Sequence, residues 1–258
     1  MANRNGVKWS REETILAYEL YCRIPFSKIS QSNPEIKKLA ELLGRTPGSV
    51  GLKMHNLAHY DPELKKRNVT AMAHGSKLDG EIFSEFCNDW TELSYQAQEI
   101  RARMQNVEVR EIIDVGDIDD IPPGEYKERV MKNRVGQYFF RMAVLSSYGN
   151  KCCITGMSKS SLLIASHIKP WNVCDEKTER TNPCNGLCLN SLHDKAFDRI
   201  TLDSKLRLIV SKEMKNAEMD KQTRDWFYGY EGKQINLPDK FLPGKSFLEY
   251  HNDVVFLG

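Results

Sequence analysis

LLIASHIKPW (Leu162–Trp171) and NPCNGLCLNSLHDKAFDR (Asn182–Arg199) are the two stretches that say most about how the second half of this chain folds. In the first stretch, the apolar run LLIAS predicts a strand that gives way to a loop at His167. In the second, Asn185 and the glycine after it form a strong turn signal, and Asn190–Phe197 is predicted to be helical. His167 lies 18 residues before Asn185, which lies nine before Asp194.

Two flanking segments extend this pattern: QYFFRMAVLSSYGNKCCITG (Gln137–Gly156) and FLEYHNDVVF (Phe247–Phe256). Together, the four segments resemble the HNH nucleases of the bacterial branch associated with restriction enzymes. The resemblance covers roughly residues 130 to 256. It implies a ββα-metal fold and a phosphodiester substrate. With a helical N-terminal half, the expected fold class is α+β.

The resemblance also assigns roles to three residues. It implies that His167 activates water as the general base, since an imidazole of pKa about 6.5 can accept a proton near neutral pH. Asn185 would tie the loop between strand and helix, because an amide can both donate to and accept from backbone groups. Asp194 would hold a metal ion from the helix.

A carboxylate at Asp194 suits Mg²⁺ or Mn²⁺, which are the expected cofactors. His193 becomes the metal ligand instead if the register shifts by one, because consecutive helix residues point about 100° apart. Many HNH sites have an aspartate directly before the catalytic histidine, whereas this chain has Ser166. That departure weakens the expected metal cage and leaves waters to complete it.

Several basic or polar side chains are candidates for DNA contact. Arg134, Gln137 and Arg141 follow i, i+3, i+7 spacing on one helix face, and the family carries a similar set ahead of its nuclease motif. Guanidinium groups suit phosphate oxygens; a buried ion pair with Asp198 is the alternative. Three further candidates, which an ordinary solvated surface would also explain, are Lys169, Lys195 and Arg199.

The first half of the chain predicts helices. In WSREETILAYELY (Trp9–Tyr21), Ser10 is the expected N-cap and Glu13 completes a capping box. Further helices are expected over Lys77–Trp90 and Tyr95–Arg103.

A helix-turn-helix is expected between these segments. One helix covers Pro34–Leu43 and ends at Gly44, and the next begins at Thr46 or Pro47. The second helix of such a pair commonly enters the major groove, which makes Ser49, Lys53 and Asn56 candidates for DNA contact. The first half also resembles Myb- or SANT-type domains, and a packing or partner-binding role stays open.

The acidic stretch NVEVREIIDVGDIDDIPPGE (Asn106–Glu125) contains a Pro-Pro-Gly break. It predicts a linker with a short strand at Val107–Ile113. The expected organisation is therefore a helical, DNA-binding domain over residues 1–105, a linker over 106–125 and an HNH nuclease domain over 126–258. Within the last domain, ITLDSKLRLIVS predicts a hairpin that turns at Asp203, and His251 is expected to have a packing role.

Composition sets wider limits. The 258 residues are 40% hydrophobic, with no apolar run of about 18 residues and no secretory signal. A globular, cytoplasmic protein without a membrane partner is expected. Seven cysteines without regular spacing indicate free thiols, and the spacing of Cys152, Cys153, Cys184 and Cys188 does not favour structural Zn²⁺. Residues 126–258 carry 21 Lys and Arg against 15 Asp and Glu, which permits contact with phosphates.

The expected function is metal-dependent hydrolysis of double-stranded DNA in bacterial restriction or DNA defence. Cutting both strands with one site per chain would be easiest for a homodimer. One alternative is a modification-dependent nuclease in which residues 1–95 sense altered bases. The other is a non-catalytic DNA-binding or regulatory protein, which the departure at Ser166 supports.

Overall fold

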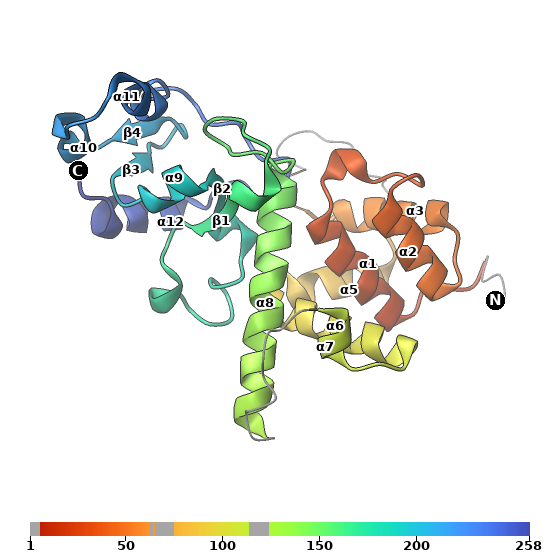
Figure 1. Ribbon diagram of the computed structural model, residues 1–258. Helices are drawn as coiled ribbons and strands as arrows, with labels where there is room; N and C mark the ends of the chain where they lie inside the picture. Colours follow the sequence, from red (N-terminus) through yellow and green to blue (C-terminus); the bar gives the residue numbers. More distant parts are fainter. Residues whose placement is uncertain (1–5, 62–63, 65–74, 114–123) are drawn as a thin grey trace. The chain divides into compact units, whose positions relative to one another are not determined.

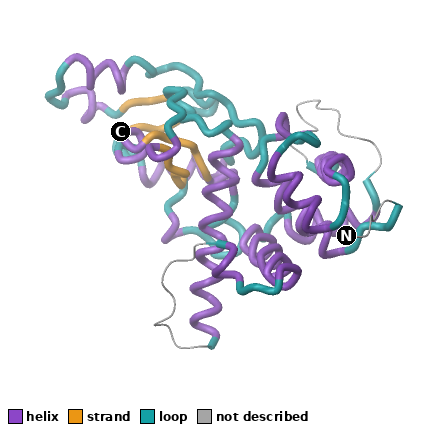
Figure 2. The backbone as a smooth tube through the Cα atoms, turned by 45° about the vertical axis from the view of Figure 1, so that its right-hand side comes forward, coloured by secondary structure: helices purple, strands orange, loops and turns teal. Residues whose placement is uncertain are grey.

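The computed structural model describes residues 6–61, 64, 75–113 and 124–258 (Figure 1). Contacts divide the chain into two compact units, the first formed by Met1–Ala143 with Glu176–Asn182 and the second by Val144–Asp175 with Pro183–Gly258. The first unit is helical, and the second contains the four strands that the described residues form (Figure 2). The α+β class is therefore confirmed.

Helix α1 (Arg11–Arg23) is the central helix of the first unit. As predicted, Ser10 caps it and Glu13 completes the capping box. Most of its residues are buried, because α1 packs against four other helices. These are α2 (Pro34–Leu43), α3 (Pro47–Ala58), α5 (Lys77–Phe86) and α6 (Trp90–Gln105).

The predicted turn between α2 and α3 is also present. Gly44 ends α2 in the left-handed region at φ 63°, and Thr46 accepts a hydrogen bond from the backbone of Ser49. Between them, the buried Arg45 guanidinium donates to both carboxylate oxygens of Glu13 at 2.8 and 3.0 Å. Bidentate pairs of this kind fix orientation as well as adding energy, so the turn is fastened to the N-terminus of α1.

Lys53, on α3, does not face solvent. Its ammonium group forms a buried ion pair with Asp79 on α5, and both side chains are at most 5% exposed. Asp79 also accepts a hydrogen bond from the Ser76 backbone at 2.8 Å as part of the α5 capping box. The charge of Lys53 is thus paired with a buried carboxylate. Lys53 also lines the groove between α3 and α5, and its contact with DNA stays a prediction.

Two local predictions in this unit need correction. The helix predicted over Lys77–Trp90 stops at Phe86, because Asp89 accepts from the Glu92 backbone and begins α6 one residue later. The strand predicted over Val107–Ile113 is instead a short helix, α7 (Val109–Ile112), whose first turn is closed by reciprocal capping between Glu108 and Glu111. Residues 114–123 of the predicted linker lie outside the described residues.

Helix α8 (Glu125–Ser147) begins in the first unit and ends in the second. The segment Glu176–Asn182 returns to the first unit, where Thr181 shares a buried 2.8 Å hydrogen bond with Thr91. The contact is close, since a Cβ on Gly136 would lie 2.8 Å from a Thr181 methyl group. Gly136 therefore lets the returning segment reach α8.

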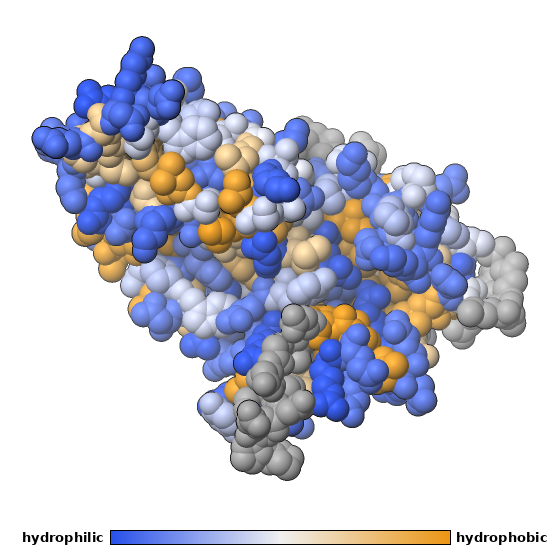
Figure 3. Space-filling view, viewed as in Figure 1, coloured by the Kyte–Doolittle hydropathy of each residue, from blue (hydrophilic) through white to orange (hydrophobic). Residues whose placement is uncertain are grey.

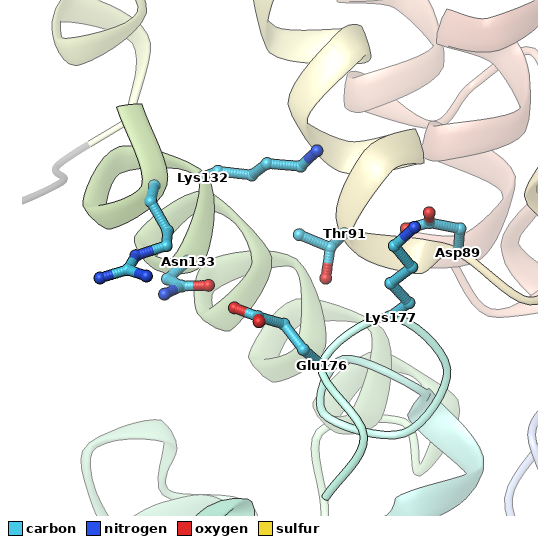
Figure 4. Close-up of a pocket in the computed structure, with 7 residues that line it drawn as sticks. Asp89, Thr91, Lys132, Asn133, Glu176 and Lys177 are labelled. Carbon is cyan, nitrogen blue, oxygen red and sulfur yellow. The ribbon is translucent and has the colours of Figure 1, made fainter. Parts of the chain in front are cut away.

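A pocket of about 240 Å³ lies beside this contact within the first unit (Figure 4). Its walls come from α6, α8 and the returning segment, and its charged side chains have both signs: Arg129, Lys132, Lys177, Asp89 and Glu176. Lys132 is paired with Glu92. The mixture of charges gives this pocket no preference for a polyanion.

The second unit begins with an antiparallel hairpin. Strand β1 (Leu163–His167) pairs with β2 (Gly186–Asn190), with His167 opposite Gly186. Asn190 then caps the short helix α9 (Ser191–Lys195) by accepting from two backbone N–H groups, and α9 packs against both strands (Figure 1). This is the ββα arrangement expected from the sequence.

The predicted second hairpin is present as β3 (Ile200–Leu202) and β4 (Leu208–Val210), with Asp203 in the turn. Short helices complete the unit: α10 (Lys212–Asn216), α11 (Lys221–Tyr228), α12 (Lys245–Tyr250) and a π-helical turn (His251–Val255). His251 is fully buried, stacks on Phe197 at 4.2 Å and is hydrogen-bonded to Thr201. Its predicted packing role is confirmed.

Among the described residues, no helix combines the length and apolar character that crossing a bilayer requires. On the face seen in Figure 3, hydrophilic residues predominate and hydrophobic ones form small separate patches. Scattered apolar residues of this kind are ordinary for a protein surface.

Replacing Lys53 by methionine should lower the free energy of unfolding by about 3–5 kcal/mol, because it leaves the Asp79 carboxylate buried without its counter-ion. Urea titration measures this change. Lys77→Met, at a side chain that is 93% exposed, is the matched control and should change stability by less than about 0.5 kcal/mol. Equal stabilities of the two variants would contradict the buried pair.

Acid should destabilise the second unit through His251. Burial lowers the pKa of His251 to about 4, partly opposed by the Phe197 backbone and by Asp198. As pH falls from 7 to 5, the unfolded state therefore takes up a proton that the folded state refuses, which removes about 2 kcal/mol of stability. Urea titrations at pH 5, 6 and 7 measure the free energy of unfolding. Between pH 7 and 5 it should fall by about 2 kcal/mol less in His251→Asn than in the wild type. The same fall in both proteins would refute this assignment.

Candidate active site

His167 lies where β1 ends, and its side chain is half-buried. The His167 imidazole packs edge-to-face with the Trp171 ring, with ring centroids 5.5 Å apart and planes at 86°. Ser166 is buried, and successive strand residues point to opposite faces. The residue in the place of the usual aspartate therefore faces away from the side on which His167 lies.

The side chain of Asn185 holds the loop that follows His167. Its Oδ1 atom accepts from the backbone N–H of Lys169 at 2.8 Å, and its Nδ2 atom donates to the carbonyl of the same residue at 3.1 Å. The Asn185 carbonyl also accepts from the backbone of Ile168 at 2.9 Å. Asn185 is fully buried, so water does not compete for these bonds.

The two candidate ligands on α9 have different environments. His193 is fully buried, accepts a 2.8 Å hydrogen bond at Nδ1 from Asn190 and packs against the rings of Trp226 and Phe227. Burial lowers its pKa to about 4, with a smaller opposing effect of the Trp226 backbone. The His193 ring is therefore packed in the core, and the alternative in which His193 holds the ion stays a prediction. Asp194, rotated about 100° from it, is only half-buried.

The three basic candidates in the second unit differ in availability. The Lys169 ammonium group lies 5.2 Å from the centre of the Tyr250 ring, and Lys195 is exposed. Arg199 forms ion pairs with Asp198 and Glu213 at 2.9 and 2.7 Å. A buried ion pair with Asp198 was the alternative to phosphate binding by the arginines of α8. Asp198 is 49% exposed, so it does not offer a buried partner.

The remaining candidates belong to the first unit. On α8, Gln137 and Arg141 are exposed and Arg134 is half-buried. On α3, Ser49 and Asn56 line a groove of about 570 Å³ whose other lining residues include Trp9, Lys8 and Lys77. These two polar residues are therefore accessible from the groove that α3 and α5 share.

The donor set for a metal ion is sparse. Within the described parts of the chain, no three His, Cys, Asp or Glu side chains form a group able to hold a metal. Asp194 can supply a single carboxylate. Mg²⁺ is commonly bound by one or two carboxylates together with waters and substrate phosphates, so the residues fit an ion that binds jointly with DNA and do not fit a preformed protein cage.

Two neighbours of the site have no signal in the sequence. Trp171 lies against His167, and the buried Cys174 thiol lies 3.2 Å from Asn185 Nδ2. Neither residue stands at a spacing typical of a metal or catalytic motif. None of the seven cysteines, all of which are described, forms a disulfide, so disulfide pairing does not distinguish Cys174 from the others.

Comparison with known families gives a match within the second half of the chain. A model described as HNH endonuclease matches residues 152–202, which include β1, β2, α9 and β3. No curated protein matches the chain. The matched segment contains the ββα unit with His167, Asn185 and Asp194, in agreement with the resemblance seen in the sequence. Over residues 152–202 the chain is therefore similar to the HNH endonuclease family.

Proposed function

We propose that this protein is a metal-dependent endonuclease that hydrolyses phosphodiester bonds of double-stranded DNA in restriction or another form of DNA defence. The observation that carries the proposal is the Asn185 clamp within an HNH segment. It bonds both backbone groups of Lys169, two residues after His167. These bonds hold the loop next to His167 in one conformation. General-base catalysis requires an imidazole that is held in position.

His167 is the proposed general base. Attack on a phosphodiester requires a water molecule that loses its proton as the new P–O bond forms. An imidazole can accept that proton near neutral pH if its ring is held in one orientation. The edge contact with Trp171 restricts the ring, and the half-buried position leaves it reachable from solvent.

Asp194 is the proposed ligand for Mg²⁺ or Mn²⁺, with waters and a DNA phosphate oxygen completing the shell. When bound, such an ion neutralises the charge that gathers on the phosphate and stabilises the leaving oxygen. The half-buried carboxylate on α9 can reach outward, whereas the neighbouring His193 is occupied in the core.

DNA contact is proposed for both units. In the groove of the first unit, Ser49 and Asn56 are accessible beside Lys8 and Lys77, which suits a polar reading surface with a basic rim. Gln137 and Arg141 on α8 are exposed, as is Lys195. Arg134, Lys169 and Arg199 are proposed as weaker contributors because each is only partly exposed. A homodimer would supply the second site needed to cut both strands.

One alternative function has a specific observation in its favour. The serine at position 166 and the sparse donor set suit a protein that binds DNA without cutting it. Incubating the wild type with methylated and unmethylated plasmid and phage DNA, with Mg²⁺ or Mn²⁺, separates the two functions. It also detects a requirement for modified bases.

His167→Ala should lower the cleavage rate by about 10²–10⁴-fold, the usual contribution of a general base, without lowering affinity for DNA. Plasmid nicking and filter binding measure the two quantities. His59→Ala, at the end of α3 in the other unit, is the control and should keep the wild-type rate. Cleavage by His167→Ala at the wild-type rate would exclude this mechanism, and an inactive wild type would favour the non-catalytic alternative.

Asp194→Asn should raise the Mg²⁺ concentration for half-maximal cleavage at least about tenfold, because a neutral amide binds hard cations more weakly than a carboxylate does. The rate is followed over a Mg²⁺ titration at saturating DNA. Glu249→Gln, at an exposed carboxylate of α12, serves as the charge-matched control. Superimposable titrations of Asp194→Asn and the wild type would show that the ion is held elsewhere.

A further inference from the structure

We propose that Cys174 is a positioning residue of this site. Its thiol closes a ring of hydrogen bonds with the Asn185 amide and the Lys169 carbonyl, and this ring sets the loop that orients His167. The inference rests on the proposed nuclease function, and it adds a residue to the machinery of that function.

The ring has a defined set of donors and acceptors. The two N–H groups of the Asn185 amide go to the Lys169 carbonyl at 3.1 Å and to the Cys174 sulfur at 3.2 Å. The thiol in turn donates to the Lys169 carbonyl at 3.3 Å. Both Asn185 N–H donors, the thiol hydrogen and both acceptor positions of the carbonyl are therefore used.

This arrangement fixes which way the Asn185 amide points. Its oxygen accepts from the Lys169 N–H at 2.8 Å, which requires the nitrogen to face the carbonyl and the sulfur. If the amide turned over, its oxygen would oppose the Lys169 carbonyl and its nitrogen would oppose an N–H group. Cys174 therefore adds a second acceptor that favours the same orientation.

The thiol also anchors the far end of the loop. Residues Trp171–Val173 form a short 3₁₀ turn for which Cys174 is the C-cap, its N–H donating to the Trp171 carbonyl. The near end is held where Ile168 donates to the Asn185 carbonyl. Trp171 lies between the two anchors and packs its ring against His167. Releasing Cys174 frees the segment that carries this ring.

Burial supports a positioning role. Cys174 is 6% exposed and Asn185 is fully buried, so water cannot readily replace the thiol. Buried polar groups left without a partner are costly, and the loop would shift to satisfy them. Small displacements of catalytic groups can lower rates by up to about 10²-fold.

The test compares three variants of the full-length protein. Cys174→Ala removes the thiol, and Cys174→Ser keeps a small group that donates and accepts. Cys153→Ala is the matched control, because it makes the same change at a fully buried cysteine of the same unit. We expect Cys174→Ala to lower the single-turnover cleavage rate about tenfold with little change in DNA affinity. Cys174→Ser should recover most of that loss, and Cys153→Ala should stay within about twofold of the wild type.

A second readout does not depend on cleavage. The imidazole carbon–proton signals of His167, assigned by their loss in His167→Ala, are followed by NMR at several pH values. In Cys174→Ala these signals should shift and broaden, while those of His251 should stay in place; in Cys153→Ala, those of His167 should not change. The thermal unfolding temperature of each variant is recorded beside these spectra.

The outcomes separate this inference from the proposed function. An inactive wild type whose His167 signals still move in Cys174→Ala would refute the nuclease function and keep the positioning role. Normal cleavage and unchanged His167 signals in Cys174→Ala, with His167→Ala inactive, would overturn the inference alone. Equal losses in Cys174→Ala and Cys153→Ala would also overturn it, because they would reduce the effect to general packing.

Discussion

The hydrogen bonds between one buried amide and one residue's backbone are the constraint on which the site depends. Asn185 satisfies both the N–H and the carbonyl of Lys169, which a loop leaving a two-stranded sheet could not satisfy through strand pairing. This interaction turns the chain sharply after His167 and keeps the end of β1 beside the start of β2. The pairing of His167 with Gly186, the Trp171 contact and the thiol at Cys174 all follow from this turn.

Much of the fold was predictable because its signals are local. The caps at Ser10 and Thr46 and the glycine that ends α2 involve residues within one helical turn of each other, and the structure has them as expected. The wrong predictions of secondary structure also came from local sequence patterns. Val107–Ile113 alternates like a strand, but Glu108 and Glu111 cap each other's backbone and close a helical turn. Local pattern gives little basis for choosing between these two outcomes in so short a segment.

The site was less predictable because its details depend on partners distant in sequence. The choice between His193 and Asp194 rests on the rotation of α9, which is fixed by Trp226 and Phe227 more than thirty residues later. Lys53 has the spacing of a DNA-reading residue, yet Asp79 on another helix pairs with its ammonium group. Cys174 lies eleven residues before Asn185 with no motif between them, so only folding brings the thiol to the amide.

The path of the chain has a consequence for modularity. The polypeptide passes between the units after Ala143, after Asp175 and after Asn182, and the middle excursion separates His167 from Asn185 in sequence. The second unit is thus not one uninterrupted piece of polypeptide. Exchanging the helical half for that of another protein would leave Thr181 without Thr91 and Gly136 to receive it. A functional exchange of the first unit between proteins must therefore replace Glu176–Asn182 together with the helices that contact it.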